Sequence, residues 1–407
     1  MISVEEARET ILSKIERLST EEVPILDSLG RVLDEDVLAE ADIPPFNNSA
    51  MDGYAVRFED TTGAGSGKPV ELKVLGDVAA GYVPESPIGK GEAIRIMTGA
   101  QMPEGANAVV MVENTERTDD DAFVFSPARP GENVRYAGED IRAGETALKH
   151  GKKVIPGDIG MMASVGKATV KVVRKPRVAI ITTGDELVNI DEPLVPGKIR
   201  NSNAYSIAAQ VIDTGCIPLM LGIARDTKEA IMGKVEEAVD RNADMLITTG
   251  GVSVGDYDFV KDILNDAGEM VFWKVAMKPG KPLAFGIIKG IPVIGLPGNP
   301  TSSMVSFEQF ARPALLKMSG RRDIARMAVE AVFQDSSFTN RTGRRNMLRV
   351  VVTKDGNSFK ARLSGSQKSG NLKPMTIANG LMVIPEDVGE IKAGDKVTVQ
   401  LFEPITE

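Results

Sequence analysis

The sequence contains one cysteine and one histidine in 407 residues, and both scarcities limit its chemistry. With Cys216 alone no intramolecular disulfide can form, which fits a reducing compartment. With His150 alone, a zinc site of several histidines is excluded. A serine or cysteine catalytic triad that depends on a histidine base is also a poor explanation of any activity. We expect Cys216 to be a small core residue at a strand start and His150 to lie exposed in a turn. Catalytic chemistry must therefore rest on carboxylates, lysines and backbone amides.

Long apolar runs are also missing. No run approaches the roughly 18 residues that a membrane span needs. The first residues form an acidic, helix-like segment rather than a basic stretch followed by an apolar one, which is the pattern of a targeting signal. We therefore expect a cytoplasmic protein with no membrane partner.

The charge balance argues against nucleic acid as a partner. The chain has 48 basic and 57 acidic residues, a formal net charge of -9 and a sequence pI near 5.1. The electric field of a chain with this net negative charge repels polyphosphate chains such as nucleic acids. A small anionic substrate remains compatible, because a local group of lysines or a helix N-terminus acts within one Debye length, roughly 8 Å.

The first helix can be located from its N-terminal signals. Ser3 as N-cap with Glu6 three residues later predicts a helix start. The apolar positions after it recur with helical spacing, so we expect one amphipathic helix. Its predicted apolar face consists of Val4, Ile11, Ile15 and Leu18.

The length of the chain and its 42% apolar content favour several domains with sizeable cores. Short alternating segments separated by glycine and proline predict a β-rich domain over residues 45–139. We expect this domain to be inserted between residues 1–44 and 140–174, which would together form one elongated, helix-containing domain.

The rest of the chain is predicted to form an α/β domain and a barrel. Apolar runs after residue 177 are typical of strands buried on both faces, and helical segments alternate with them, so we expect a parallel sheet over residues 175–325. Asp226 with Glu229 predicts a capping box for one of these helices. Residues 326–407 are expected to form a β-barrel-like domain. Its five predicted strands are residues 329–333, 347–352, 359–363, 381–384 and 396–401.

Two strands of the predicted sheet end in nearly the same sequence, Ile-Thr-Thr-Gly-Asp-Glu-Leu over residues 181–187 and Ile-Thr-Thr-Gly-Gly-Val-Ser-Val-Gly-Asp-Tyr-Asp over residues 247–258. Ligands of open α/β sheets bind beyond the carboxyl ends of strands. Glycines there let backbone amides approach a ligand, and carboxylates are ligands that Mg²⁺ takes. Each loop alone is equally an ordinary helix start, where acidic residues favour the helix dipole by about 0.3 to 1 kcal/mol. The residues concerned are Gly184, Asp185, Glu186, Gly250, Gly251, Gly255, Asp256 and Asp258.

Two further segments have the composition of an anion site. Residues 296–303, Leu-Pro-Gly-Asn-Pro-Thr-Ser-Ser, begin a predicted helix whose free amides and hydroxyls suit an anion. A capped helix after a proline turn is the plainer interpretation. In residues 273–282, Lys274 and Lys278 would point to one side of an extended backbone and form a cationic pair for phosphate or an oxyanion. Separate surface lysines explain that pattern equally simply.

The N-terminal part adds three turn-like motifs, Pro-Phe-Asn-Asn-Ser-Ala-Met-Asp-Gly-Tyr-Ala, Met-Thr-Gly-Ala and Gly-Glu-Asp-Ile. They precede Thr-Thr-Gly-Asp-Glu-Leu, Gly-Gly-Val-Ser-Val-Gly, Lys-Pro-Gly-Lys-Pro and Leu-Pro-Gly-Asn-Pro along the chain. In this order the seven motifs resemble the MoeA family of molybdopterin molybdenumtransferases, whose animal counterpart is the E domain of gephyrin. The resemblance covers nearly the whole chain.

The resemblance implies an elongated four-domain homodimer whose active site is shared between the α/β domain of one subunit and the β-rich domain of the other. It implies a reaction in which adenylylated molybdopterin and molybdate are the substrates, Mg²⁺ assists hydrolysis of the adenylate, the metal stays on the dithiolene and AMP is released. Molybdopterin adenylyltransferase and molybdoenzymes are the protein partners that it suggests.

The site residues follow from the matching motifs. The resemblance implies Asp52, Asp140, Glu186 and Asp258 as catalytic residues, and Glu186, Asp52 and Asp258 as candidate Mg²⁺ ligands. A metal held there would neutralise charge as the adenylate is cleaved, while the lysines would hold molybdate. The implied substrate-binding residues are Thr98, Asp226, Gly250, Gly251, Ser253, Lys274, Lys278, Lys281, Pro297, Pro300, Ser302, Arg349 and Ser366.

Two other functions stay open. Molybdopterin adenylyltransferases share the Thr-Thr-Gly-Gly and Pro-Gly-Asn-Pro elements but lack the N-terminal and C-terminal modules. A scaffold that binds partner peptides would not require the carboxylates and lysines. Molybdate and tungstate are tetrahedral oxyanions of similar size, and the motifs suit both.

Overall fold

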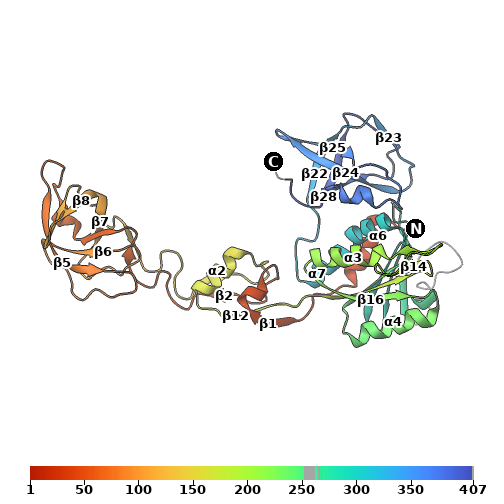
Figure 1. The fold of residues 1–407 in the computed structure, drawn as a ribbon, viewed down its shortest axis with the longest axis horizontal. Coiled ribbons are helices and arrows are strands. Elements are labelled where there is room, and N and C mark those ends of the chain that lie inside the picture. The colour runs from red at the N-terminus through yellow and green to blue at the C-terminus, as the bar shows by residue number, and fades with distance from the viewer. Residues whose placement is uncertain (252–261, 265, 267, 406–407) are drawn as a thin grey trace. The chain divides into compact units, whose positions relative to one another are not determined.

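The computed structural model describes residues 1–251, 262–264, 266 and 268–405, which form two compact units (Figure 1). Unit 1 comprises Met1–Glu21, Gly30–Val32 and Val172–Glu407, and unit 2 comprises Glu22–Leu29 and Leu33–Lys171. In the described part of the chain, no helix is long and apolar enough to cross a membrane. The strands β1 (Thr20–Pro24) and β12 (Thr169–Val173) lie where the chain passes between the units.

A six-stranded sheet forms the α/β domain of unit 1, in the order β16-β13-β17-β21-β20-β18. The first four strands are parallel, β20 pairs antiparallel with β21, and β18 pairs antiparallel with β20. The predicted parallel sheet is confirmed, with one strand, β20, running in the opposite direction between β21 and β18. The strands are β13 (Arg177–Thr183), β16 (Ile217–Ala224), β17 (Met245–Thr249), β18 (Gly268–Lys274), β20 (Pro282–Ile288) and β21 (Ile291–Leu296).

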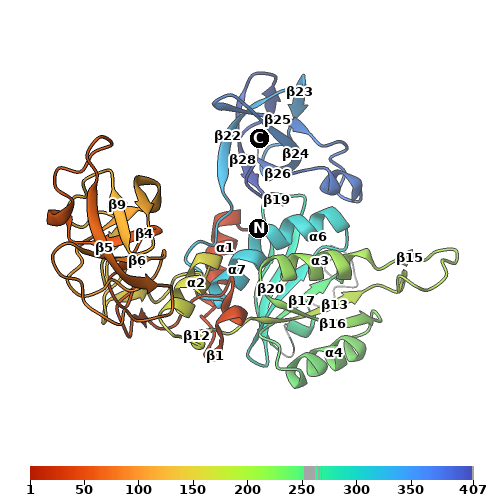
Figure 2. The same ribbon diagram turned by 60° about the vertical axis from the view of Figure 1, so that its left-hand side comes forward.

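Helices cover both faces of this sheet (Figure 2). One core packs β13 against α3 (Ser202–Asp213) and α6 (Pro300–Ser306), and the other packs it against α4 (Lys228–Asp240). Along β13, Val178 and Ile180 belong to the first core, whereas Ala179 and Ile181 belong to the second. Burial on both faces explains why the strand is apolar throughout. Cys216, just before β16, is buried in the first core as predicted.

The first helix is shorter than its apolar pattern suggested. α1 spans Val4–Ser13, and Ser3 Oγ accepts the Glu6 amide at 3.0 Å, so the predicted N-cap is confirmed. The predicted apolar face is wrong in its last turn, because Ile15 and Leu18 follow the end of the helix. Both still pack on the first core, which is why their spacing looked helical.

The predicted cap of α4 is off by one residue. Thr227, not Asp226, is the N-cap, with extended backbone at φ -134° and Oγ1 accepting the Ala230 amide at 3.2 Å. The capping box with Asp226 is therefore wrong. Because Thr227 caps the helix, the Asp226 carboxylate is free to turn toward the end of the sheet.

The C-terminal domain is a closed barrel, as predicted. β24 pairs with both β25 and β26, and the order β24-β25-β22-β28-β26 returns to β24. The predicted strands are all present. They are β22 (Ala328–Phe333), β24 (Arg345–Asp355), β25 (Ser358–Leu363), β26 (Gly380–Ile384) and β28 (Lys396–Leu401), with β23 (Ser337–Thr339) and β27 (Glu390–Lys392) forming a separate pair.

A buried ion pair joins the barrel to the α/β domain. Glu308 lies in the π-helical turn η4 (Phe307–Ala311), between α6 and α7 (Arg312–Met318). Arg326 Nε lies 3.0 Å from Glu308 Oε2, and its Nη1 donates to Phe402 O at 2.5 Å. Since Phe402 follows the last barrel strand, one arginine binds both domains.

The prediction that Lys274 and Lys278 share one extended strand is wrong. Lys274 ends β18 in the α/β sheet, whereas Lys278 lies in β19 (Met277–Lys278), which pairs with β24 of the barrel. The chain turns between them, with the Met277 amide donating to Val275 O at 2.9 Å. The alternation rule fails because it assumes a continuous strand.

Unit 2 contains the predicted β-rich domain. Its six-stranded sheet has the order β7-β4-β6-β5-β9-β8 and is antiparallel except for the β5–β6 pair. His150 is exposed, as predicted, although its Nε2 lies 3.4 Å from Asp34 Oδ1. The strands are β4 (Gly53–Val56), β5 (Val70–Val78), β6 (Glu92–Ile96), β7 (Ala108–Met111), β8 (Thr115–Arg117) and β9 (Asp121–Val124). The other elements are β2 (Val37–Leu38), β3 (Asn48–Ser49), β10 (Val134–Arg135), β11 (Thr146–Leu148), α2 (Pro156–Ser164) and the 3-10 turns η1 (Ile25–Ser28), η2 (Phe58–Thr61) and η3 (Val112–Asn114).

Candidate functional site

A pocket of about 730 Å³ opens in unit 1 at the carboxyl ends of the parallel strands. This is the edge where open α/β sheets bind ligands, and the residues after β13, β16, β17 and β21 all reach it. The lining residues are Thr183, Gly184, Glu186, Leu187, Ile199, Arg200, Asn201, Ser202, Asn203, Asp226, Thr249, Gly250, Gly251, Pro282, Pro297, Gly298, Asn299, Pro300 and Gly370.

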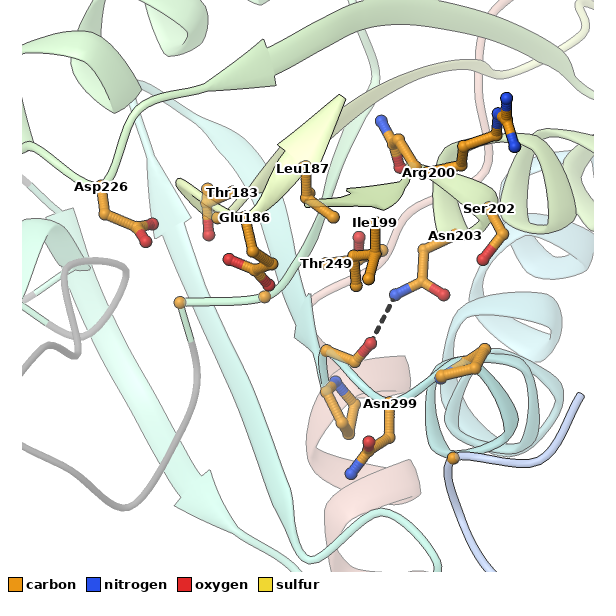
Figure 3. Close-up of a pocket in the computed structure, with 18 of the residues that line it drawn as sticks. Thr183, Glu186, Leu187, Ile199, Arg200, Ser202, Asn203, Asp226, Thr249 and Asn299 are labelled. Atoms are coloured by element: carbon orange, nitrogen blue, oxygen red, sulfur yellow. Dashed lines mark hydrogen bonds between the residues drawn. The ribbon is translucent and has the colours of Figure 1, made fainter. Parts of the chain in front are cut away.

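Two carboxylates gather at one end of this pocket. Figure 3 shows Glu186 and Asp226 there, with the Thr183 side chain between them. Asp226 Oδ1 and the hydroxyls of Thr183 and Thr249 are buried, and none of these three oxygens has a hydrogen-bond partner among the described residues. Buried polar atoms are normally paired, so these oxygens suit a ligand with donors or a cation. Burial is the main cause that raises the pKa of Asp226, and the nearby charges of Asp185 and Glu186 add to it.

Asp226→Asn is expected to raise the thermal midpoint of unfolding near pH 7. The folded pKa of Asp226 lies above its usual 3.8, so the native state loses stability as pH rises through that range and this carboxyl ionises. The neutral amide of the Asp226→Asn variant avoids the cost of burying an ionised carboxylate. The gain should disappear near pH 3, where the carboxyl is protonated in both states. Thermal unfolding followed at both pH values tests this, and a gain of equal size at pH 3 would contradict it.

A glycine is required beneath the pocket. Gly250 has φ +87°, and a Cβ there would lie 2.3 Å from Thr183 O. Only a residue without a side chain lets the loop after β17 pass so close to β13. The sequence predicted that glycines in this loop let the backbone approach a ligand closely. Gly250 and Gly251 both line the pocket, in agreement with that prediction.

Asparagines hold the other end of the pocket, and the sequence reasoning missed them. Asn203 Nδ2 donates to Gly298 O at 2.7 Å, which ties α3 to the loop after β21 (Figure 3). Asn201 caps α3 through the Ala204 amide and donates to Thr182 Oγ1 at 2.6 Å. An Asn-Ser-Asn sequence before an apolar helix was the available signal, since asparagine is a favoured N-cap.

The start of α6 is less open than the sequence suggested. Pro297 and Pro300 line the pocket. The Thr301 amide, however, donates to Ser369 O at 3.2 Å, and Thr301 Oγ1 donates to Asn371 O at 2.8 Å. The expectation of free groups there is therefore wrong at Thr301, because a barrel loop occupies them. Ser302 is buried in α6 and is not part of the described lining.

The implied lysines do not reach this pocket in the described structure. Its lining includes neither Lys274, Lys278 nor Lys281. Between the last two, Gly280 has φ +105°, and a Cβ there would lie 2.5 Å from Ser306 Oγ. The lysine loop therefore packs directly on α6, where the hydroxyls of Ser303 and Ser306 are buried without a partner among the described residues.

Arg349 and Ser366 occupy different environments in the barrel. Arg349 is fully buried in β24, and its Nη2 donates to Ser366 O at 3.2 Å. Its Nε and Nη1 have no partner among the described residues, and burial lowers the pKa of the guanidinium to about 10. Ser366 itself is exposed and lines a separate hollow of about 430 Å³.

Unit 2 brings two of its three implied residues together. Asp52 Oδ1 accepts the Thr98 amide at 2.6 Å and the Thr98 hydroxyl at 2.8 Å. These bonds lower the pKa of Asp52, so it is ionised at neutral pH. Asp140 is exposed, and no contact joins its side chain to that pair among the described residues. Two implied residues of the α/β domain, Ser253 and Asp258, lie outside the described residues.

Family models match the chain in three consecutive parts. Residues 2–166 match the MoeA N-terminal region (domain I and II), residues 179–317 a probable molybdopterin binding domain, and residues 331–402 the MoeA C-terminal region (domain IV). The order of the three parts is the order of the motifs along the chain.

Relatives match over the full length. The chain is similar to Molybdopterin molybdenumtransferase 2 of Mycobacterium tuberculosis (strain ATCC 25618 / H37Rv), at 40% identity over 405 residues, 98% of this chain and 99% of that protein. It is similar to Molybdopterin molybdenumtransferase of Bacillus subtilis (strain 168), at 38% identity over 98% of this chain and 94% of that protein. Its fold is similar to the crystal structure of molybdopterin biosynthesis moea protein from Pyrococcus horikosii, with a TM-score of 0.84, 36% identity and 100% coverage of both chains. Because these likenesses extend from end to end, the chain belongs to the MoeA family of molybdopterin molybdenumtransferases.

Proposed function

We propose that this chain transfers molybdenum from molybdate to adenylylated molybdopterin and releases AMP. The observation that carries the proposal is the pocket at the carboxyl edge of the sheet, with Glu186 and Asp226 beside the unpartnered hydroxyls of Thr183 and Thr249. Its volume of about 730 Å³ lies in the range of small-molecule and cofactor sites. The names of the full-length relatives give the chemistry, and the pocket supplies groups that suit it.

The carboxylate end of the pocket fits Mg²⁺. Asp226 Oδ1 is a buried oxygen without a partner among the described residues, and Glu186 lies at the same end. One or two carboxylates together with substrate phosphate oxygens are the usual Mg²⁺ ligands in proteins. Glu186 and Asp226 would hold the ion, with Asp258 as a further candidate from the sequence. When bound, Mg²⁺ would neutralise negative charge on the phosphate oxygens.

A second group of residues suits the molybdate oxyanion. Ser303 and Ser306 present buried hydroxyls without partners, and the Lys278–Lys281 loop packs on Ser306 through Gly280. Lys278 pairs with Asn346 of β24, the strand that also contains Arg349. The unpartnered Nε and Nη1 of Arg349 supply further donors. We propose that these hydroxyls and cations bind molybdate, in keeping with the preference of oxyanions for charged donors.

The proposal retains a homodimer with shared active sites. Asp52 keeps one oxygen on Thr98 and stays ionised, so it can orient a water molecule or a metal ligand. In a shared site, Asp52, Thr98 and Asp140 of a second copy would complete the pocket that contains Glu186. The sequence resemblance supports this arrangement, which mixed dimers can test.

The experiment is AMP release from adenylylated molybdopterin, measured with and without molybdate in the presence of Mg²⁺. We expect release that depends on molybdate, together with formation of cofactor that activates an apo-molybdoenzyme. Consumption of ATP with unadenylylated molybdopterin would instead indicate an adenylyltransferase. The absence of both activities would overturn the enzymatic proposal and favour a scaffold.

A further inference from the structure

Unit 2 contains a hollow that the proposed function does not use. It measures about 420 Å³ and is lined by residues 75–79, residues 82–86 and Ile94. Ile94 is buried in the core of the β-rich domain, whereas most of the other lining residues are exposed. The hollow therefore lies on the surface of the sheet domain, with two apolar core residues, Val78 and Ile94, in its lining.

A bulge in β5 forms one wall of the hollow. The pairing of β5 with β6 shifts between Val74 and Asp77, so Leu75 and Gly76 together stand opposite Ile94. On its other side β5 pairs with β9 only from Val70 to Lys73. The Val74 amide still donates to Asp120 O at 2.8 Å, and from Leu75 to Val78 this edge of β5 has no strand partner in the described part of the chain. An open strand edge of this kind can accept an extended segment of another chain.

Large apolar side chains surround the hollow without cover. Tyr82 and Val83 are each 71% exposed, and Leu75 is 38% exposed. Isolated exposed apolar residues are ordinary, but these three all line the same hollow. Apolar side chains gathered beside an unpaired strand edge are the features that an extended partner segment can use.

The charge of unit 2 indicates what kind of segment fits. Unit 2 contains 25 acidic and 14 basic residues, a net charge of -11, which exceeds the -9 of the whole chain. At the hollow, Asp77 pairs with Arg117 at 2.9 Å, whereas Glu85 forms no ion pair with any described residue. An acidic surface with a free carboxylate favours a basic partner, both by steering and by contact.

We propose that this hollow binds an extended segment of a partner protein in which apolar and basic side chains alternate. Alternate side chains of an extended segment point to opposite sides. One set would then enter the hollow against Leu75, Tyr82 and Val83, while the basic set would meet Glu85 and the acidic surface. The backbone of the segment would lie along the free edge of β5.

The test uses a capped, labelled peptide of alternating valine and lysine, with a valine–glutamate peptide as its charge-reversed control. Fluorescence polarisation is measured with the full chain at low salt. We expect saturable binding of the lysine peptide, about tenfold weaker binding by the double variant Tyr82→Ser/Val83→Ser, and weaker binding by Glu85→Lys. The matched control is Leu26→Ser in η1, which removes an apolar side chain of similar exposure, 74%, outside the hollow. It should bind like the native chain.

Three results would overturn the proposal. The first is equal binding of both peptides to the native chain, and the second is unchanged binding by the double variant. The third is loss of self-association in that variant with no peptide binding in either protein, which would assign the hollow to a second copy. Sedimentation and thermal unfolding accompany each measurement, and the double variant should unfold like the native chain because both side chains are mostly exposed.

Discussion

Glu186→Gln is expected to lower molybdate-dependent AMP release by about 10² to 10³-fold. Glutamine preserves the shape of the side chain and removes its charge, so the pocket should stay intact while a proposed Mg²⁺ ligand is lost. Glu186 lines the pocket beside Asp226, where like charges already oppose each other. Relief of that repulsion should leave the thermal midpoint unchanged or higher. Single-turnover AMP release and thermal unfolding, measured on the same preparation, separate the two effects.

Glu192→Gln is the matched control for this variant. Glu192 lies in the same loop region after β13, and both of its oxygens accept hydrogen bonds from Asn189, at 2.9 and 3.1 Å. It is exposed and does not line the pocket. Its replacement should leave turnover unchanged. If Glu186→Gln retained activity within about threefold of the native chain, the carboxylate would have no part in transition-state stabilisation.

Mixed dimers extend this test to the proposed site shared between two subunits. In the proposed homodimer, Asp52→Asn is expected to lower activity strongly, as is expected of Glu186→Gln. In a mixed dimer of the two variants, a shared arrangement combines both substitutions in one site and leaves the other site intact. Activity should therefore reappear when the variants are co-expressed. Failure to recover activity, with mixed dimers demonstrated by two affinity tags, would contradict the shared site.

Much of the fold was predictable because it follows from local pattern. Continuous apolar runs identified β13 and β17, since strands buried on both faces cannot alternate. The five barrel strands were found within a few residues. The errors arose where a distant contact decides the structure. Ile15 mimics a helical position because the chain beyond α1 still packs on the same core. The division into four domains and its limits stay predictions, since the structure separates two compact units.

The position of the pocket at the carboxyl edge of the sheet was predictable, whereas the contacts of several of its residues were not. Gly184 and Glu186 after β13 and Gly250 and Gly251 after β17 were predicted, because topology alone brings the carboxyl ends of parallel strands together. The carboxylates predicted after β17 lie outside the described residues. The partners of Thr301 were not, since Ser369 and Asn371 come from the barrel about 70 residues later. The turn that separates Lys274 from Lys278 was likewise hidden, because β19 pairs with a strand of another domain.

Arg349 is the least expected feature of unit 1. A buried cation normally has an acidic partner, because desolvation of an isolated charge costs far more than one hydrogen bond returns. Arg349 is fully buried, yet its Nη2 donates only to the carbonyls of Ser366 and Lys368 among the described residues, and its Nε and Nη1 have no partner there. With a pKa of about 10 it remains cationic at neutral pH. A buried guanidinium without a counter-charge lowers the stability of the fold, and a bound anion would restore it. This is why we propose that molybdate binds next to Arg349.

Arg349→Met should therefore separate stability from function. Methionine fills a similar volume without charge, so the free energy of unfolding should stay the same or rise by up to about 4 kcal/mol, while molybdate-dependent AMP release falls about 10²-fold. The control is Arg326→Met, which removes the nearer of two arginines that pair with buried Glu308, leaving Arg312 at 3.9 Å, and should lower the free energy of unfolding by about 1.5 to 3 kcal/mol. The gain in the free energy of unfolding from Arg349→Met should shrink as pH rises above about 10. The guanidinium of the native chain then loses its proton, and the cost of burying its charge disappears. Denaturant unfolding and AMP release measure both effects, and a large loss of stability in Arg349→Met would show that the arginine already has its counter-charge within the fold.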